Sequence, residues 1–551
     1  MTSTDPGHRA TLPAAPQAAA HRPVLPVPPA PHAPPAAPAG YRVPRPARTA
    51  WTAAGSPRRT WASRGVLLGV LFLQAVLSLR LDNTAYSDEA LYITAGHVEL
   101  AHLLHGAPVL TDYASYFSGS PTLYPIVAAL ADAWLGLTGA RLLSLACMLG
   151  ATTLLYGTTR RLFNERAALA AAALFAVTQS TVALGWFATY DAAAILLLAL
   201  AAWILVRTDR AHPGWAALAA PVAVLAAGTK YAAALYLPTL IVLAVLVAWP
   251  HRGRASLWRA AAFTLAVGAL LAAGLYGTDL LAGVRMTTTA RAHGNEEALH
   301  LLEKSVTWSG LLFLTACGGA VAYARRGRMN ESPDTRRHPV PGRAWRVLLG
   351  VLLCGTALLA PAYQIHLHTS VALYKHLGFG LFFAAPLAGV GLTRLVGAHF
   401  RNAQLACALW VVMLCLGMVQ SVERFGSWPP SGQLTATLRQ YVTPGEGRYL
   451  ASLPNVPVYY LRDVTDHTHW TSLYWIGYRD ADGVEHHDDD GYRRAIADGW
   501  FDLIVLDGVT VPQKDKVIAT ALRDSDKYRL LGTLPFRLGE GQGSYRIWVR
   551  R

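Results

Sequence analysis

The sequence predicts a mainly α-helical protein that crosses a membrane many times and ends in a small α/β domain. Of its 551 residues, 53% are hydrophobic and only 15% are charged, against about 25% charged in a typical soluble domain. The apolar residues gather in blocks such as Ala167–Leu184 and Tyr236–Trp249, several long enough to cross a hydrocarbon core of about 30 Å. A soluble core could not bury so many helices that are apolar on every face.

Basic residues between the apolar blocks indicate the orientation of the chain. We expect eleven spans, at about 65–81, 139–157, 166–185, 192–206, 215–229, 232–249, 260–278, 306–323, 346–363, 377–396 and 403–421. With the arginine-rich N-terminal region inside, the basic loops after the second, fourth, sixth, eighth and tenth spans all fall on the inner side. The net charge of +15 therefore indicates cytoplasmic loops, and nucleic-acid binding is a poor interpretation.

One apolar segment, 121–138, has to be left out of the count, because adding it would place the basic loop at Arg160–Arg166 outside. We expect it to form a helix at the outer interface, with Asp132, Tyr124 and Trp134 near the headgroups.

The chain is predicted to have three parts. Residues 1–60 are rich in Pro and Ala and indicate a disordered cytoplasmic tail. Residues 61–421 form the membrane module. Residues 422–551 form an extracytoplasmic α/β domain, since eleven spans that start inside must end outside. That last part carries apolar runs at Val456–Leu461, Leu503–Leu506 and Tyr545–Val549, and a helical stretch, Lys514–Arg523, separates the last two.

Two adjacent carboxylates, Asp88 and Glu89, follow the first span on the predicted outer face. They admit two compatible interpretations. The first is a helix start, with Ser87 or Asp88 as cap and the acids in the first turn. The second is a chemical role, because a capped helix start also holds a carboxylate rigidly.

Further ionisable residues lie on the same face. Asp191 stands between two spans, where charged groups usually face a cavity, although an interfacial loop acid is the alternative. Lys375 and His376 follow a loop with His366 and His368, and Lys375 either binds an anionic headgroup or snorkels at a helix end. The outward cations Lys230, Arg285 and Arg291 share this ambiguity.

Other motifs give no metal or redox site. The run Glu485-His486-His487-Asp488-Asp489-Asp490 lacks spaced ligands, so a solvated loop is the better interpretation. The five cysteines lie in apolar blocks without a C-x-x-C pair and are expected to be small buried hydrophobes.

Three groups of short patterns follow one another through residues 64–250. They are Ser87-Asp88-Glu89-Ala90-Leu91-Tyr92; Gly119-Ser120-Pro121-Thr122-Leu123-Tyr124 with Gly139-Ala140-Arg141-Leu142-Leu143-Ser144 and Arg160-Arg161-Leu162-Phe163; and Thr189-Tyr190-Asp191 with Gly228-Thr229-Lys230. In this order and spacing they resemble the polytopic glycosyltransferases of the GT-C fold. The resemblance is closest to the branch with the protein O-mannosyltransferases and the bacterial aminoarabinose transferase of lipid A. Tyr374–Lys375 is a looser match further on.

The resemblance implies an inverting transfer of a hexose or pentose from a polyprenyl phosphate to an acceptor hydroxyl on the outer face. The acceptor would be a cell-envelope glycan, a glycolipid or a protein. Asp88 matches the family's base, beside Glu89, and Asp191 matches its second outer-loop acid. The donor phosphate would meet cations and polar groups at Lys375, Tyr374, His376, Lys230 and Arg285. Some relatives carry a lysine beside the proline of the second pattern, where this chain has Ser120. The resemblance leaves open whether a divalent cation is needed.

A different class, a multi-pass transporter or flippase of lipid-linked sugars, would also explain many spans with charges at membrane depth. Transporters usually show internal repeats with broken helices in matching positions. The sequence shows no such repeat, and its acids concentrate on one face, so the enzyme is the favoured prediction.

Overall fold

The computed structural model describes residues 57–276, 278, 280–326, 341–397, 400–539 and 541–551. The predicted tail, 1–60, lies outside this part of the chain except for its last four residues, which form the first turn of a helix. The described residues all belong to one compact unit.

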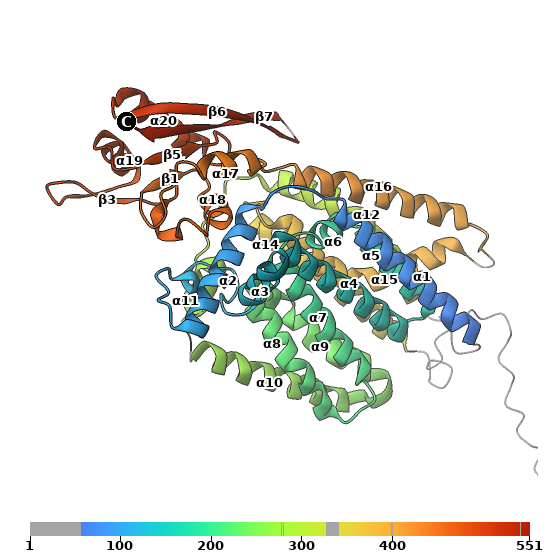
Figure 1. Cartoon of the computed structure of the whole chain (residues 1–551). Coiled ribbons are helices and arrows are strands. Elements are labelled where there is room, and N and C mark those ends of the chain that lie inside the picture. Colours follow the sequence, from blue (N-terminus) through green and yellow to red (C-terminus); the bar gives the residue numbers. More distant parts are fainter. Residues whose placement is uncertain (1–56, 277, 279, 327–340, 398–399, 540) are drawn as a thin grey trace, which may run out of the picture. The chain divides into compact units, whose positions relative to one another are not determined.

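From residue 57 to Phe425 the described chain is helical (Figure 1). Its helices are α1 (Pro57–Leu79), α2 (Ser87–His105), η2 (Tyr113–Ser115), α3 (Tyr124–Leu135), α4 (Leu137–Leu162), α5 (Glu165–Ala176), α6 (Gln179–Leu184), α7 (Tyr190–Arg207), η3 (Pro213–Leu218), α8 (Ala219–Thr229), η4 (Tyr231–Tyr236), α9 (Leu237–Arg252), η5 (Gly253–Ala255), α10 (Ser256–Tyr276), α11 (Leu280–Thr287), α12 (Ala298–Arg326), α13 (Arg343–Ala357), α14 (Leu359–His366), α15 (Leu373–Val396) and α16 (Ala403–Phe425).

Among the described residues, seven helical stretches are long and apolar enough to cross a membrane, or eight if the bent pair α13–α14 counts as one span. The sequence predicts eleven spans, and three features of the structure account for the difference from seven or eight. The stretch Tyr231–Tyr276 holds two expected spans in one run. The expected span 166–185 is broken into α5 and α6. The expected span 215–229 lies in a helical stretch, Pro213–Thr229, that is shorter than the seven.

Helix α15 lies at the centre of the helical core and is buried along most of its length. It packs against α5 and α12. Glycines permit this close approach, because a Cβ on Gly389 would stand 2.2 Å from the carbonyl oxygen of Ala167. The buried helix carries Lys375 and His376 in its first turn, so the same packing that fixes α15 also fixes these two side chains.

Helix α3 has 12 residues, about 18 Å of helix, too short to cross a core of about 30 Å. This agrees with the expectation that 121–138 is not a span. Trp134 is 87% exposed. Asp132 and Tyr124, which we expected near the headgroups, are instead buried.

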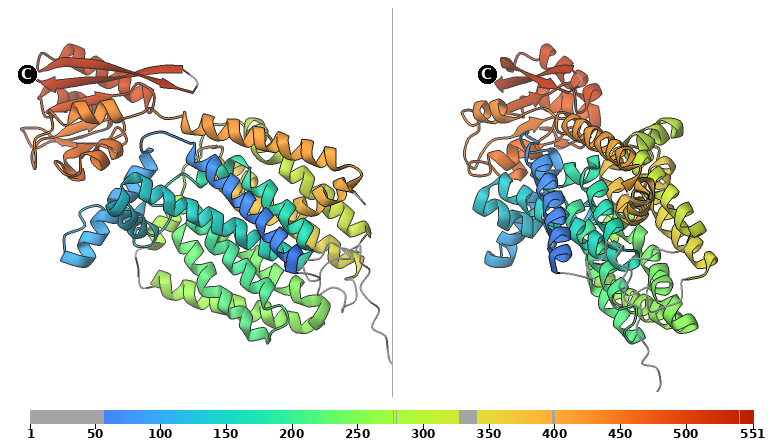
Figure 2. Two further views of the ribbon diagram at one scale, coloured as in Figure 1. Left: turned by 45° about the vertical axis from the view of Figure 1, so that its right-hand side comes forward. Right: turned by 90° about the vertical axis from the view of Figure 1, so that its right-hand side faces the viewer.

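Strands occur in the C-terminal, red part of the described chain (Figure 2). The elements are α17 (Gly432–Leu438), β1 (Tyr449–Ala451), α18 (Asn455–Tyr460), η8 (His467–His469), β2 (Trp470–Thr471), β3 (Gly477–Arg479), β4 (Glu485–His487), α19 (Asp488–Ala497), β5 (Leu503–Leu506), α20 (Pro512–Asp524), β6 (Tyr528–Leu538) and β7 (Gly541–Arg550). Five strands form a mixed sheet in the order β2-β1-β5-β7-β6, and β3 pairs with β4. Strands β1, β2 and β5 are parallel, whereas β7 is antiparallel to β5 and β6.

The apolar runs of this region take different structures. Leu503–Leu506 is β5, Tyr545–Val549 lies in β7, and Lys514–Arg523 lies in α20. The run Val456–Leu461 is not a strand, because most of it forms the short helix α18. Apolar residues in so short a run fit either element, and tertiary contacts decide. The acidic run 485–490 forms β4 and the start of α19.

A buried carboxylate in α20 makes the stability of this sheet depend on pH. Asp515 accepts hydrogen bonds from Ser452 Oγ at 2.8 Å and from the backbone N–H of Gly508 at 2.6 Å. Burial, opposed by the bond from Ser452 and reinforced by the charge of Asp507, raises the pKa of Asp515 from its usual 3.8 to about 6. The folded state therefore binds this proton more tightly than the unfolded state.

We expect Asp515→Asn to stabilise the sheet at pH 7.5, where the wild-type carboxylate is charged and buried. The advantage should shrink as the pH falls from about 6 towards 4, because wild-type Asp515 then takes up its proton. Hydrogen exchange of the β1 and β5 amides should be about tenfold slower in the variant than in the wild type at pH 7.5. Asp524→Asn, at the exposed end of the same helix, is the control. If the variant and the wild type exchanged these amides at the same rate at pH 7.5 as well as at pH 4, the buried charge at Asp515 would be contradicted.

Candidate active site

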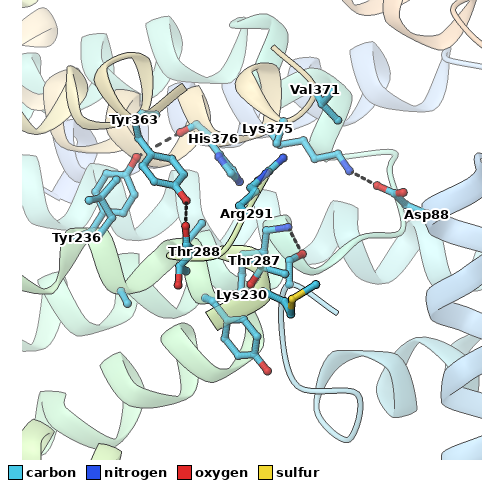
Figure 3. Close-up of a pocket in the computed structure, with 18 of the residues that line it drawn as sticks. Asp88, Lys230, Tyr236, Thr287, Thr288, Arg291, Tyr363, Val371, Lys375 and His376 are labelled. Carbon is cyan, nitrogen blue, oxygen red and sulfur yellow. Dashed lines mark hydrogen bonds and ion pairs between the residues drawn. The ribbon is translucent and has the colours of Figure 1, made fainter. Parts of the chain in front are cut away.

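Residues far apart in the sequence line one cavity of about 440 Å³ (Figure 3). Its wall comes from the start of α2, from the junction of α8 with η4, from the segment after α11, and from α14 and α15. The ionisable residues that line it, tyrosines apart, are Asp88, Lys230, Arg291, Lys375 and His376. The cavity thus combines one carboxylate with several cationic groups.

Asp88 and Lys375 form the central ion pair. Lys375 Nζ donates to Asp88 Oδ2 at 2.6 Å. The Lys375 side chain is 6% exposed and that of Asp88 is 35% exposed, so the carboxylate keeps an open side. The ammonium of Lys375 also lies 5.2 Å from the ring centroid of Phe187, which helps to hold a cation away from water.

Lys230 enters the cavity from the end of α8. Its Nζ donates to Ser118 Oγ at 2.8 Å and lies 3.9 Å from Asp191 Oδ1. The chain around Ser118 crosses close to the end of α8, and a Cβ on Gly119 would stand 2.0 Å from the carbonyl oxygen of Thr229. The patterns that begin with Gly119 and with Gly228 therefore meet in space, and only a glycine fits at that crossing.

Arg291 is the third cation of the cavity, and contacts of the loop after it hold the chain in place. Gly294 N–H donates to the carbonyl oxygen of Leu367 at 2.9 Å. Glu296 accepts from Ser370 Oγ at 2.7 Å and from Lys304 Nζ at 2.8 Å. These contacts lie between the segment that carries Arg291 and the turn before α15.

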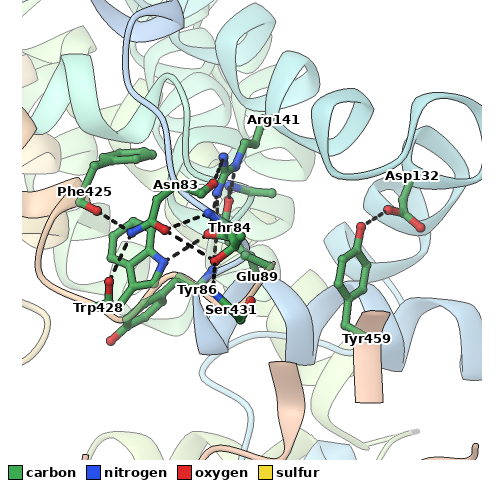
Figure 4. Close-up of polar contacts among 12 residues, drawn as sticks. Asn83, Thr84, Tyr86, Glu89, Asp132, Arg141, Phe425, Trp428, Ser431 and Tyr459 are labelled. Atoms are coloured by element: carbon green, nitrogen blue, oxygen red, sulfur yellow. Dashed lines mark hydrogen bonds and ion pairs between the residues drawn. The ribbon is translucent and has the colours of Figure 1, made fainter. Parts of the chain in front are cut away.

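Glu89 does not line the cavity. It is fully buried and accepts from Nε and Nη2 of Arg141, at 2.9 and 2.8 Å (Figure 4). It also accepts from the backbone N–H groups of Ala188 and Tyr86, both at 2.9 Å. The helix cap is Tyr86, rather than Ser87 or Asp88 as the sequence suggested, while both acids do lie in the first turn of α2. The two neighbouring carboxylates thus have different surroundings.

The segment before α2 is also tied to the end of the helical region (Figure 4). Asn83 Nδ2 donates to the carbonyl oxygens of Phe425 and Trp428, at 2.7 and 3.1 Å. Trp428 Nε1 donates in turn to the carbonyl oxygen of Thr84 at 3.0 Å. Asp88 therefore follows a stretch of backbone whose position is fixed from several sides.

The remaining candidates lie around the cavity in different ways. His376 lines it, with Nδ1 3.0 Å from Gln364 Nε2. Asp191 and Tyr374 are buried and do not line it. Arg285 is exposed on α11 and does not line it either.

Two cations near the site were not among the site residues selected from the sequence. Arg291 was considered as an outward cation, but nothing in the sequence ranked it above Arg285. Arg424, at the end of α16, stacks on Tyr374 at 3.8 Å from the ring centroid. An arginine at a helix end is usually a snorkelling side chain, so no sequence pattern singles out Arg424.

A second buried carboxylate joins α2, α3 and α18. Asp132 accepts from Tyr459 Oη at 2.5 Å and from Arg462 Nη2 at 2.8 Å, and His97 Nε2 lies 2.8 Å away. Burial alone would raise the pKa of Asp132, but the hydrogen bonds of His97 and Tyr459 and the charge of Arg462 hold it below the usual value. The ionised acid therefore links α2 and α3 to the C-terminal region.

Within the described residues, no group of three His, Cys, Asp or Glu side chains is arranged to hold a metal ion. Asp88 and Asp191 each face a lysine instead.

The fold is that of solved polytopic GT-C glycosyltransferases. Residues 123–276 match the family model of the dolichyl-phosphate-mannose-protein mannosyltransferases. The resemblance predicted from the short patterns is confirmed.

The likeness to solved structures extends over most of the chain. ArnT from Cupriavidus metallidurans bound to undecaprenyl phosphate has 14% identity and a TM-score of 0.54, covering 88% of this chain and 97% of that one. Its apo state has 15% identity and a TM-score of 0.54, covering 89% and 98%. The oligosaccharyltransferase AglB from Archaeoglobus fulgidus, in complex with an inhibitory peptide and a dolichol-phosphate, has 13% identity and a TM-score of 0.50, covering 88% and 74%. No curated protein matches the sequence.

Proposed function

We propose that this chain is an inverting glycosyltransferase that moves a sugar from a polyprenyl phosphate to an acceptor hydroxyl. The observation that carries the proposal is the cavity in which the open carboxylate of Asp88 meets Lys375, Lys230 and Arg291 (Figure 3). The similar structures of ArnT and AglB hold undecaprenyl phosphate and dolichol-phosphate, which supports a lipid phosphate as the donor.

The reaction needs a base, an electrophilic carbon and a stabilised leaving group. The acceptor oxygen attacks the anomeric carbon, Asp88 accepts the hydroxyl proton, and the bond from that carbon to the phosphate oxygen breaks. Direct displacement inverts the configuration of the carbon. The negative charge that grows on the departing phosphate is stabilised by Lys230, Arg291 and Lys375, which line the same cavity.

The apolar part of the cavity fits the lipid of such a donor. Leu235, Met286, Ala360 and Val371 line it beside the cations. A polyprenyl chain gains from contact with these side chains, while its phosphate reaches the charged end. Some relatives carry a lysine at the position of Ser120, where it meets the donor phosphate. Lys230 contacts Ser118 in the same segment, so we propose that Lys230 supplies the positive charge that this chain lacks at Ser120.

The alternative is a transporter or flippase of lipid-linked sugars, which would bind the same lipid without breaking a bond. The purified protein should be incubated with a panel of undecaprenyl-phosphate sugars together with glycan, glycolipid and peptide acceptors, and released undecaprenyl phosphate should be measured. Release from one donor is expected for the transferase. Binding of a donor with no release, with or without added acceptors, would favour the transporter.

Lys375 should act mainly on the donor. We expect Lys375→Ala to raise the KM for the lipid-phosphate sugar at least about tenfold, because a hydrogen bond to a charged group contributes about 1.5–3 kcal/mol. The KM for the acceptor should change less. Arg285→Ala is the matched control, since Arg285 is an exposed cation outside the cavity. An unchanged donor KM in Lys375→Ala would remove that lysine from the phosphate site.

We further propose eleven crossings, with the N-terminus cytoplasmic and the C-terminal region outside. Helices α9 and α10 pack on each other around Gly253, whose φ is 53°, which supports two crossings in Tyr231–Tyr276. The stretch Pro213–Thr229 joins six 3₁₀ and eleven α-helical residues, roughly 28 Å in all. The pair α5–α6 covers 165–184, close to 30 Å.

Labelling of single cysteines tests this orientation. In a background without the five natural cysteines, Asp482→Cys should react with an impermeant maleimide on intact cells. Arg254→Cys, in the turn between α9 and α10, should react only after lysis. The reverse pattern would place Asp88 and its cavity on the cytoplasmic side.

A further inference from the structure

A second cavity, of about 830 Å³, has part of its wall on α2, as the candidate active site does. Its wall is made by α2, by the segment around Thr111–Tyr116, and by the C-terminal stretch from Leu453 to Gly477 with Trp500. Sites for small ligands commonly have volumes of about 300–1,000 Å³. We call this cavity the aromatic groove.

Large aromatic side chains lie open in the aromatic groove. Tyr474 and Trp475 are each 70% exposed, and Tyr116 is 44% exposed. Exposed tryptophan and tyrosine at one place usually mark a binding surface. The faces of these rings carry negative charge, and they suit the C–H faces of sugar rings.

The polar lining of the aromatic groove is uncharged apart from one histidine. Among the described residues that line it, the polar groups are hydroxyls, such as those of Thr468 and Ser472, the amide of Asn455, and His467. Thr94 Oγ1 is buried without a hydrogen-bond partner among the described residues. Neither Lys, Arg, Asp nor Glu contributes to this wall, so the groove offers hydrogen bonds to a neutral, hydroxyl-rich ligand and no counter-charge to an anion.

The aromatic groove and the active-site cavity share the first turns of α2. Asp88 and Tyr92 line the cavity, whereas Leu91 and Thr94 line the groove. Asn455 Nδ2, in the groove wall, donates to Ser87 Oγ at 3.0 Å, one residue before Asp88.

We propose that the aromatic groove binds a neutral carbohydrate chain and presents one of its hydroxyls to Asp88. This inference rests on the proposed function and names the acceptor class, a glycan. A peptide is the competing ligand, because β2 is an edge of the sheet and Trp470 and Thr471 line the groove. Strand β2 has only two residues and offers little backbone for pairing, whereas the open rings and hydroxyls extend along the wall.

Binding to immobilised glycans tests the proposal. The full-length protein in detergent is applied to an array of neutral oligosaccharides of glucose, mannose, galactose and arabinose, and to an array of Ser/Thr-rich peptides. We expect retention on one class of glycan. Trp475→Ala should reduce it about tenfold, and Trp475→Phe, which keeps a ring, should retain more. Trp134→Ala removes an exposed tryptophan from α3, outside the groove, and should change nothing.

Three results would overturn the proposal: retention on no glycan, retention equal in Trp475→Ala and wild type, or Trp475-dependent retention on peptides alone. Because retention needs neither a donor nor transfer, its failure leaves the donor-release test of the transferase unaffected. A failed donor-release test likewise leaves the glycan-binding result standing.

Discussion

Replacement of Asp88 by asparagine is expected to abolish sugar transfer while the protein remains folded and abundant in the membrane. Asparagine has nearly the same shape and can still accept the hydrogen bond from Lys375. It cannot accept the hydroxyl proton at neutral pH. Loss of a general base lowers the rate by about 100- to 10,000-fold. The side chain of Asp88 is about one-third exposed, so little stability should be lost.

The measurement is the rate of undecaprenyl phosphate release with donor and acceptor both saturating, together with the amount of folded protein after purification. Asp82→Asn, six residues earlier and exposed, is the matched control and should have wild-type activity. Full activity of Asp88→Asn would exclude Asp88 as the base. Loss of folded protein in that variant would show that its pair with Lys375 is mainly structural.

Replacement of the next residue, Glu89, by glutamine is expected to lower the stability of the protein strongly, whereas Asp88→Asn should lower activity and leave stability nearly unchanged. Both oxygens of Glu89 accept hydrogen bonds from Arg141 and from backbone N–H groups. The side chains of Glu89 and Arg141 are both buried. A glutamine would leave the Arg141 charge buried and turn an NH₂ group towards another donor. Breaking a buried pair in this way costs about 3–5 kcal/mol.

The midpoint of thermal unfolding in detergent and the abundance in membranes measure this effect. The double variant Glu89→Leu with Arg141→Met removes both charges and should recover part of the lost stability. The family resemblance suggests a catalytic role for Glu89 beside Asp88. A Glu89→Gln protein with normal stability and no transfer would support that assignment against the structural role that its contacts favour.

The sequence predicted the class of fold and the place of most helices because both follow from local composition. Apolar blocks and arginine clusters are visible without knowledge of any long-range contact. Asp88 could be selected for the same reason, since its pattern lies within a few residues of the first span. The number of crossings was less accessible, because breaks such as that between α5 and α6 depend on how the helices pack.

The different surroundings of Asp88 and Glu89 could not be predicted, because the partners that distinguish them lie far away in the chain. Lys375 is 287 residues from Asp88, and Arg141 is 52 residues from Glu89. Arg291 was indistinguishable from Arg285 for a similar reason, since only the folded loop directs one of them into the cavity. Helix α18 could not be predicted as a helix, because its apolar run is short enough to form a strand equally well.

The contacts of Asp132 imply an order of events during synthesis of the chain. Tyr459 is 327 residues from Asp132, so it leaves the ribosome tens of seconds later at about 5–20 residues per second. Throughout that interval this acid of α3 lacks two of its three side-chain partners. The packing of α3 on α2, the helix that carries Asp88, is therefore completed only near the end of translation, so the protein becomes complete as one of the last steps of its own assembly.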